Sequence, residues 1–185
     1  MKFKTFLAGC LGGLLSLNSC TNSPDMTDYA AYVNPFIGTG GHGHTFPGAI
    51  VPHGMISPSP DTRIDGWDAC SGYYYADSTI NGFSHTHLSG TGCCDYGDVL
   101  LMPTVGEQKY LPTGSQSQQM AYASAFSHQN ETAEPGYYSV FLDTYQVKAE
   151  LTASKRAAIH RYTFPESKEA GFILDLDYSL QRQTN

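Results

Sequence analysis

Residues 135–153 read PGYYSVFLDTYQVKAELTA, and this stretch decides the fold class. After the turn signal at Glu134 and Pro135, residues 137–142 are rich in aromatic and β-branched side chains, as β-strands are. Every second residue of 147–153 is apolar and its neighbours are polar or charged. This period of two is typical of a half-buried strand. The stretch therefore predicts two consecutive strands.

The same pattern continues towards the C-terminus. Residues 157–164 predict a third strand that Pro165 closes, and residues 171–180 predict a fourth. Residues 113–119 are rich in Ser and Gln and predict a loop, and no segment has the pattern of an amphipathic helix. Short strands joined by polar turns predict an all-β fold, an antiparallel β-sandwich over residues 29–185. The apolar face predicted for the fourth strand is Phe172, Leu174, Leu176 and Tyr178, with Asp175 and Asp177 opposite.

Composition narrows the choice of partners. The chain has 185 residues, 41% hydrophobic and 15% charged, which suits one globular domain. Its net charge is −7 and its ten Lys and Arg residues are scattered. Phosphate binding needs clustered basic residues, so the composition argues against nucleic acid as a partner.

The first twenty residues have the pattern of an export signal. Lys2 and Lys4 precede an apolar run over residues 6–17, which is shorter than the ~20 residues that span a bilayer. Leu17–Cys20 resembles a bacterial lipobox, so we expect residues 1–20 to be a lipoprotein signal peptide with Cys20 lipidated. Residues 21–28 would then be a polar tether. The expected location is lipid-anchored to a bacterial membrane, on the periplasmic or cell-surface side; the alternative is an ordinary signal peptide.

Three cysteines remain in the expected mature domain: Cys70, Cys93 and Cys94. In an exported chain an odd number allows at most one disulfide, which would join Cys70 to one of the adjacent pair. The alternative is three buried, reduced thiols that act as small hydrophobic groups. Both interpretations stay open at the level of sequence.

Between Asn34 and Asp98 the chain concentrates five of its seven histidines and its only tryptophan. Two H-x-H pairs occur here, and on a strand such a pair places both rings on one face. The spacing matches no specific metal signature, so the histidines are interpreted as the lining of a polar pocket, with no metal site. The two pairs are His42 with His44, and His85 with His87.

The tripeptide Gly66–Asp68 suggests sugar recognition. The apolar ring of Trp67 can cover the C–H face of a sugar, and the carboxylate of Asp68 can accept hydroxyl hydrogen bonds. The alternative is a tryptophan that anchors the core. The nearby carboxylates could form an acid–base pair for glycoside hydrolysis, or they could cap turns. They are Asp65, Asp68, Asp95 and Asp98.

Several longer motifs, in this order, resemble the start of glycoside hydrolase family 92. They run essentially from Tyr29 to the C-terminus. One departure is Gln129, which stands where the family motif has an acidic residue. The motifs are Tyr32–Thr39, His42–Ala49, Gly66–Asp68, Cys70–Tyr73, Ile80–Gly92, Gly97–Asp98, Met102–Pro103, Ser127–Glu131 and Pro135–Tyr138.

The resemblance implies a two-domain, calcium-dependent, inverting exo-α-mannosidase. In that family a β-sandwich packs on a larger (α/α) barrel that carries the catalytic acid and base and most calcium ligands. This chain ends before such a barrel, so the resemblance implies no catalytic residue here. It implies one wall of a mannose pocket, formed by Trp67 and Asp68 with His42, His44, His85 and His87 nearby.

We therefore expect a truncated N-terminal sandwich that contacts α-mannose-containing glycans, is inactive alone and lacks its catalytic barrel as partner. Calcium is expected for the full-length family. The alternative from another class is a free-standing, lipid-anchored carbohydrate-binding module, and a third hypothesis is a small metalloprotein built on the H-x-H pairs.

Overall fold

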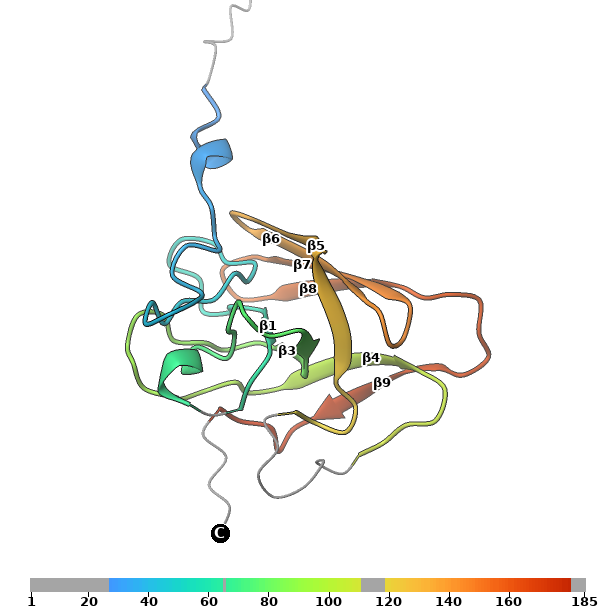
Figure 1. The fold of residues 1–185 in the computed structure, drawn as a ribbon. Coiled ribbons are helices and arrows are strands. Elements are labelled where there is room, and N and C mark those ends of the chain that lie inside the picture. The colour runs from blue at the N-terminus through green and yellow to red at the C-terminus, as the bar shows by residue number, and fades with distance from the viewer. Residues whose placement is uncertain (1–26, 65, 111–118, 181–185) are drawn as a thin grey trace, which may run out of the picture.

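The computed structural model describes residues 27–64, 66–110 and 119–180. These residues form two antiparallel sheets that face each other (Figure 1), which confirms the predicted all-β sandwich. The expected signal peptide with Cys20, most of the tether, Asp65 and most of the predicted 113–119 loop lie outside the described residues. Within the described residues no helix has the length and apolarity to span a membrane.

The first sheet has the strand order β1-β3-β4-β9 and the second has the order β2-β5-β6-β7-β8. Every strand pairing in both sheets is antiparallel. The first sheet contains β1 (Ser59–Asp61), β3 (Gly82–Ser84), β4 (Leu100–Val105) and β9 (Ala170–Asp175). The second contains β2 (Thr79–Ile80), β5 (Ser124–Glu134), β6 (Tyr137–Leu142), β7 (Val147–Ala153) and β8 (Ala158–Thr163).

Strands β6, β7 and β8 confirm three of the sequence predictions. β6 and β7 have the predicted bounds, and β8 lies within the predicted 157–164. The alternation of β7 holds in part: Ala149 and Leu151 are buried and Lys148 is exposed, but Glu150 is also buried (7% exposed). Period-two patterning therefore located the strands that have one face in the core.

Phe83 of β3 packs where the two sheets meet. Its ring centroid lies 6.5 Å from that of Tyr138 on β6 and 6.1 Å from that of Tyr162 on β8. Phe83 and Tyr138 are fully buried, within a cluster that draws on both sheets. Such aromatic contacts across the interior bury large apolar areas and hold the layers at a fixed spacing.

Strand β9 corrects the predicted orientation and length of the fourth strand. It ends at Asp175, because the Asp175 carboxylate accepts the Asp177 N–H (3.0 Å) and turns the chain. Its register sets Ile173 opposite Met102 of β4, so Ile173 faces the core and is 5% exposed. The predicted apolar face divides: Phe172, Leu174 and Leu176 are 50%, 56% and 72% exposed, whereas Tyr178, beyond the end of β9, is buried (3% exposed). Pairing with β4, rather than alternation alone, decided which face was buried.

The long connections gather at one end of the sandwich, drawn in blue, cyan and green at the left of Figure 1. They include two 3₁₀ helices, η1 (Tyr29–Tyr32) and η2 (Trp67–Ala69), and no α-helix occurs among the described residues. This loop end holds both predicted H-x-H pairs and the predicted tryptophan site.

The outer face of the second sheet predicts an acid-sensitive contribution to stability. Arg161 donates two hydrogen bonds to Glu150 (2.7 and 2.6 Å) and Tyr137 donates a third (2.8 Å). The hydrogen bonds from Arg161 and then Tyr137 lower the pKa of Glu150 from 4.5 to about 2. A depressed pKa in the folded state stabilises the protein above the unfolded pKa, and the stabilisation is lost as pH falls towards the folded value.

We expect Glu150→Gln to lower the free energy of unfolding at neutral pH, with the deficit closing between pH 4.5 and about 2. Urea denaturation at neutral pH and near pH 2 measures both values. A deficit that is the same at both pH values would contradict this account.

Candidate functional site

The first pair of histidines lies on a tight turn over residues 34–45, which we call the histidine turn. Backbone bonds from Thr39 N–H to the Phe36 carbonyl (3.2 Å) and from Thr45 N–H to the Gly38 carbonyl (3.2 Å) close it. A Cβ at Gly43 would lie 2.1 Å from the Gly38 carbonyl oxygen, so only glycine fits there. The Gly-rich sequence thus folds the chain back on itself and presents His42 and His44.

The second part of the site is η2 (Trp67–Ala69). Gly66 precedes η2 with φ +104°, which favours glycine, and its carbonyl accepts the Ala69 N–H (3.1 Å). Ala69 is buried and anchors the turn, while the Trp67 side chain projects outward and the residue is 58% exposed. The alternative interpretation of Trp67 as a core anchor is therefore wrong.

Four predicted site residues meet here, and we call them the tryptophan cluster: His42, His44, Trp67 and Asp68. His42 Nδ1 lies 2.5 Å from Asp68 Oδ1. The His42 ring lies 5.0 Å from the Trp67 ring, and the His44 ring packs edge-on at 4.3 Å and 78°. The histidine turn thus supports Trp67 and fixes the orientation of the Asp68 carboxylate.

Within this cluster, His44 has a strained backbone conformation. It is a buried non-glycine residue with φ 55°, and its carbonyl accepts the Gly90 N–H (2.6 Å). A Cβ at Gly92 would lie 3.1 Å from Trp67 Nε1 and 3.4 Å from the His44 ring. Left-handed backbone at a non-glycine residue persists only where the surroundings enforce it, and such strain gathers at functional sites.

The arrangement suits the binding of a polyhydroxylated ligand. An exposed indole ring can stack on an apolar C–H face. The neighbouring carboxylate of Asp68, whose side chain is about two-fifths exposed, can accept hydrogen bonds from hydroxyl groups. Because His42 already holds one carboxylate oxygen, Asp68 is oriented before a ligand arrives.

The structure does not bring His85 and His87 into the tryptophan cluster. The His87 side chain is fully buried, with Nε2 2.8 Å from Asp61 Oδ1 and Nδ1 2.7 Å from the Ser57 carbonyl. Nδ1 donates to the Ser57 carbonyl, and Nε2 lies within hydrogen-bond distance of both Asp61 Oδ1 and the Ser84 hydroxyl, the latter at 3.0 Å. His85 Nδ1 donates to the Val99 carbonyl (2.5 Å), and its ring stacks on His160 at 4.8 Å. Burial, and then His85, lower the pKa of His160 to about 4.

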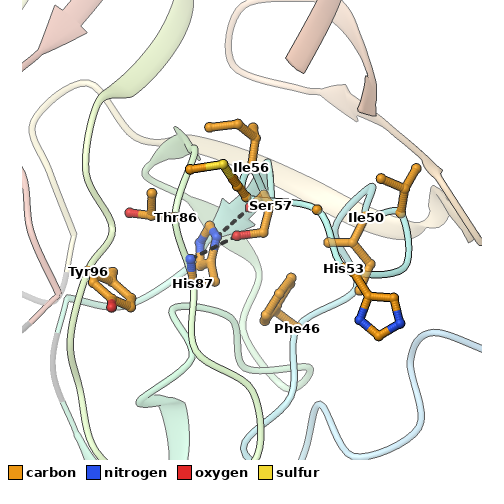
Figure 2. Close-up of a pocket in the computed structure, with 11 residues that line it drawn as sticks. Phe46, Ile50, His53, Ile56, Ser57, Thr86, His87 and Tyr96 are labelled. Atoms are coloured by element: carbon orange, nitrogen blue, oxygen red, sulfur yellow. Dashed lines mark hydrogen bonds between the residues drawn. The ribbon is translucent and has the colours of Figure 1, made fainter. Parts of the chain in front are cut away.

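His87 instead lies at the wall of a groove of about 450 Å³ (Figure 2). Its ring packs against Phe46 (4.9 Å), and Figure 2 shows its hydrogen bonds to Ser57. Tyr96 and Met55 also line the groove. No sequence pattern predicted these lining residues, because their separate segments meet only in the folded chain.

The structure also bears on the alternatives for the carboxylates and for the cysteines. Asp95 accepts the N–H of its neighbour Tyr96 (2.8 Å), and Asp98 accepts the Thr86 hydroxyl (2.8 Å) from a segment twelve residues away, so neither contact caps a turn. No disulfide joins the three described cysteines: Cys70 is buried and Cys93 is exposed. Neither cysteine interpretation therefore holds in full.

The third hypothesis, a metalloprotein built on the H-x-H pairs, requires a cluster of metal ligands. Within residues 27–64, 66–110 and 119–180, no three His, Cys, Asp or Glu side chains gather so that they could hold a metal ion. We assign no step to calcium in this part of the chain.

Gly92 offers a direct test of how Trp67 is held. We expect Gly92→Ala to change the tryptophan band of the near-ultraviolet circular dichroism spectrum, because the new methyl group would press on Trp67 and His44. Trp67 is the only tryptophan, so the band reports on this site alone. Measuring that band in the folded variant checks the prediction.

Gly90→Ala is the matched control. Gly90 has φ +73° and Gly92 has φ +68°, so both variants carry a similar backbone strain of roughly 1–2 kcal/mol. A Cβ at Gly90 meets nothing within 4 Å. Equal spectral changes in both variants would show that backbone strain, not contact with Trp67, causes the effect.

Comparison with known proteins supports a specific family. A family profile described as the glycosyl hydrolase family 92 N-terminal domain matches residues 32–185. An uncharacterized secreted glycosidase of Arthroderma benhamiae is 32% identical over 141 residues, which cover 76% of this chain and 18% of that protein.

Solved structures agree. The family GH92 α-mannosidase BT3965 of Bacteroides thetaiotaomicron, solved also with mannoimidazole, is 47% identical with a TM-score of 0.77, over 82% of this chain and 20% of that one. The family GH92 inverting mannosidase BT2199 of the same organism is 34% identical with a TM-score of 0.68, over 83% and 20%. The chain thus spans about a fifth of the length of these relatives. It belongs to glycosyl hydrolase family 92, whose N-terminal domain it matches.

Proposed function

We propose that this chain is the carbohydrate-contacting N-terminal domain of an α-mannosidase, and that its tryptophan cluster contacts an α-linked mannose unit. The observation that carries the proposal is the exposed Trp67 ring beside an Asp68 carboxylate that His42 orients. The names of two solved relatives describe mannosidases, and one of them was solved with mannoimidazole.

Each member of the cluster has a separate task in this proposal. Trp67 stacks on the C–H face of the sugar, and the outer oxygen of Asp68 accepts a hydroxyl hydrogen bond. His42 holds Asp68, and His44 supports the Trp67 ring from below. His87 supports the loops from inside, because both of its ring nitrogens are already bonded within the protein.

Hydrolysis requires more than the tryptophan cluster supplies. An inverting glycosidase needs two carboxyl groups ~6.5–9.5 Å apart on opposite sides of the glycosidic bond. In the cluster, Asp68 is the carboxylate in contact with the ring system, and it is bonded to His42 rather than poised as an acid. We assign the catalytic acid and base, the inverting chemistry and calcium binding to the portion of the longer relatives that this chain does not match. The chain alone is then inactive.

Export and lipid attachment at Cys20 belong to the proposal on the strength of the leader pattern alone. Acyl groups on Cys20, seen by intact mass in membrane-extracted protein, would support this; unmodified soluble protein would oppose it.

The test combines binding and catalysis on the purified chain. We expect methyl α-mannoside to change the Trp67 fluorescence saturably and α-mannobiose with calcium to release no mannose. Trp67→Ala should weaken binding about tenfold by calorimetry, as loss of a stacking contact of ~1.4 kcal/mol would.

Methyl α-galactoside serves as the stereochemical control and should bind more weakly. Absence of any response to the mannoside would remove the proposed sugar contact. Robust mannose release by the chain alone would refute the assignment of catalysis to another domain.

A further inference from the structure

Strand β5 contains a carboxylate that the core does not need for packing. Six residues of β5, from Phe126 to Glu131, lie opposite three residues of β6, from Leu142 to Val140. This bulge sets Glu131 opposite Val140, on the inner face of the sheet, where its side chain is 1% exposed. Bulges re-aim side chains and are frequent near functional sites.

Three side chains donate to Glu131. The Tyr73 hydroxyl lies 3.0 Å from both carboxylate oxygens, the Tyr138 hydroxyl lies 2.6 Å from Oε1, and His128 Nδ1 lies 2.6 Å from Oε2. Burial, and then the Glu131 charge, raise the pKa of both phenols, which keeps them protonated as donors. An apolar residue would fill this space with less desolvation cost, so a buried ionic network suggests a role in specificity.

His128 connects Glu131 to the half-exposed ring of Tyr75. It stacks flat on Tyr75, with ring centroids 4.2 Å apart and planes 11° apart. The ring of Phe126 also packs edge-on against the His128 ring, with centroids 5.1 Å apart. Because Nδ1 is held by Glu131, the imidazole plane is fixed, and so is the face it offers to Tyr75.

Tyr75 contacts the histidine turn directly. Its backbone N–H donates to the Thr39 carbonyl (2.9 Å), and its ring meets Phe36 edge-on at 5.8 Å. A Cβ at Gly40 would lie 3.7 Å from the Tyr75 Cβ, so the turn passes close against this residue. The same turn carries His42 and His44, which hold Asp68 and Trp67.

We infer that Glu131 and His128 are positioning residues for the tryptophan cluster, acting through Tyr75 and the histidine turn. They fix Tyr75, Tyr75 fixes the turn, and the turn places His42 and His44 against Asp68 and Trp67 for mannose binding. The inference rests on the proposed function for the identity of the ligand, and on the contacts from Glu131 to the histidine turn for the path.

The experiment compares variants of the chain by two readouts: the tryptophan band of the near-ultraviolet circular dichroism spectrum without sugar, and the Kd for methyl α-mannoside by calorimetry. Tyr75→Leu removes the stack at a residue that is 45% exposed, so the variant should fold. We expect it to change the band and raise the Kd about fivefold.

Tyr75→Phe keeps the aromatic ring, so we expect the tryptophan band and the Kd of the parent chain. If Tyr75 acted through its hydroxyl group instead, Tyr75→Phe would change both readouts. Glu131→Gln should behave like Tyr75→Leu. The matched control is Glu150→Gln, which makes the same chemical change at another buried carboxylate of the second sheet, bonded to Arg161 on its outer face. It should leave both readouts unchanged.

The inference is overturned if Tyr75→Leu and Glu131→Gln keep the parent band and a Kd within about twofold. Should Glu131→Gln fail to fold, Tyr75→Leu and Tyr75→Phe decide the matter. If the parent chain binds no mannoside, the proposed function fails, while the sugar-free tryptophan band still decides whether these residues position Trp67.

Discussion

The buried contact between Asp61 and His87 is the interaction on which the loop end of this domain depends. Asp61 closes β1 and is fully buried, and His87 joins it at 2.8 Å while bonding the Ser57 carbonyl at 2.7 Å. Gly72 packs so tightly here that a Cβ would lie 2.2 Å from Asp61 Oδ1. This buried carboxylate thus ties the loop after β3 to the first sheet, next to the segment that carries Gly72. Replacing His87 would leave the Asp61 carboxylate buried without this partner, and an uncompensated buried charge is strongly destabilising.

Rigid loops matter because the tryptophan cluster is built from turns. Its members come from two segments, the histidine turn and η2, with the loop around Gly92 packed against both. A binding site on loops is accurate only if each loop is held by interactions of its own. The domain meets this requirement from two sides: Asp61 and His87 hold the loops after β1 and β3, and Glu131 with His128 hold the histidine turn through Tyr75.

Family membership and this geometry support the same proposal, in which this domain contacts the sugar and another domain carries the catalytic groups. The match to the N-terminal family domain covers most of the chain, whereas the chain spans about a fifth of the solved mannosidases. In the proposal, one wall of the sugar pocket is built here from an aromatic ring and an oriented carboxylate. Charge development at the anomeric centre then belongs to groups carried by another domain.

Sequence patterns predicted the fold where a single physical signal dominates. β6 and β7 follow from period-two burial, and the exposure of Trp67 beside Asp68 follows from the glycine-flanked turn that carries them, whereas sugar binding there is the proposal. β5 escaped the period because its bulge breaks the alternation between Phe126 and Glu131. The orientation of β9 depended on its register with β4, and no local pattern encodes that. The H-x-H motif also misled in part, since His85 and His87 lie in a loop after β3 and point to different partners.

The most direct test of the central claim is a crystal structure of this chain with methyl α-mannoside bound. The account predicts the sugar ring stacked on the exposed face of Trp67, with a hydroxyl group within hydrogen-bond distance of Asp68. A mannoside that binds in the groove beside Phe46 and Tyr96, and leaves Trp67 uncovered, would contradict it.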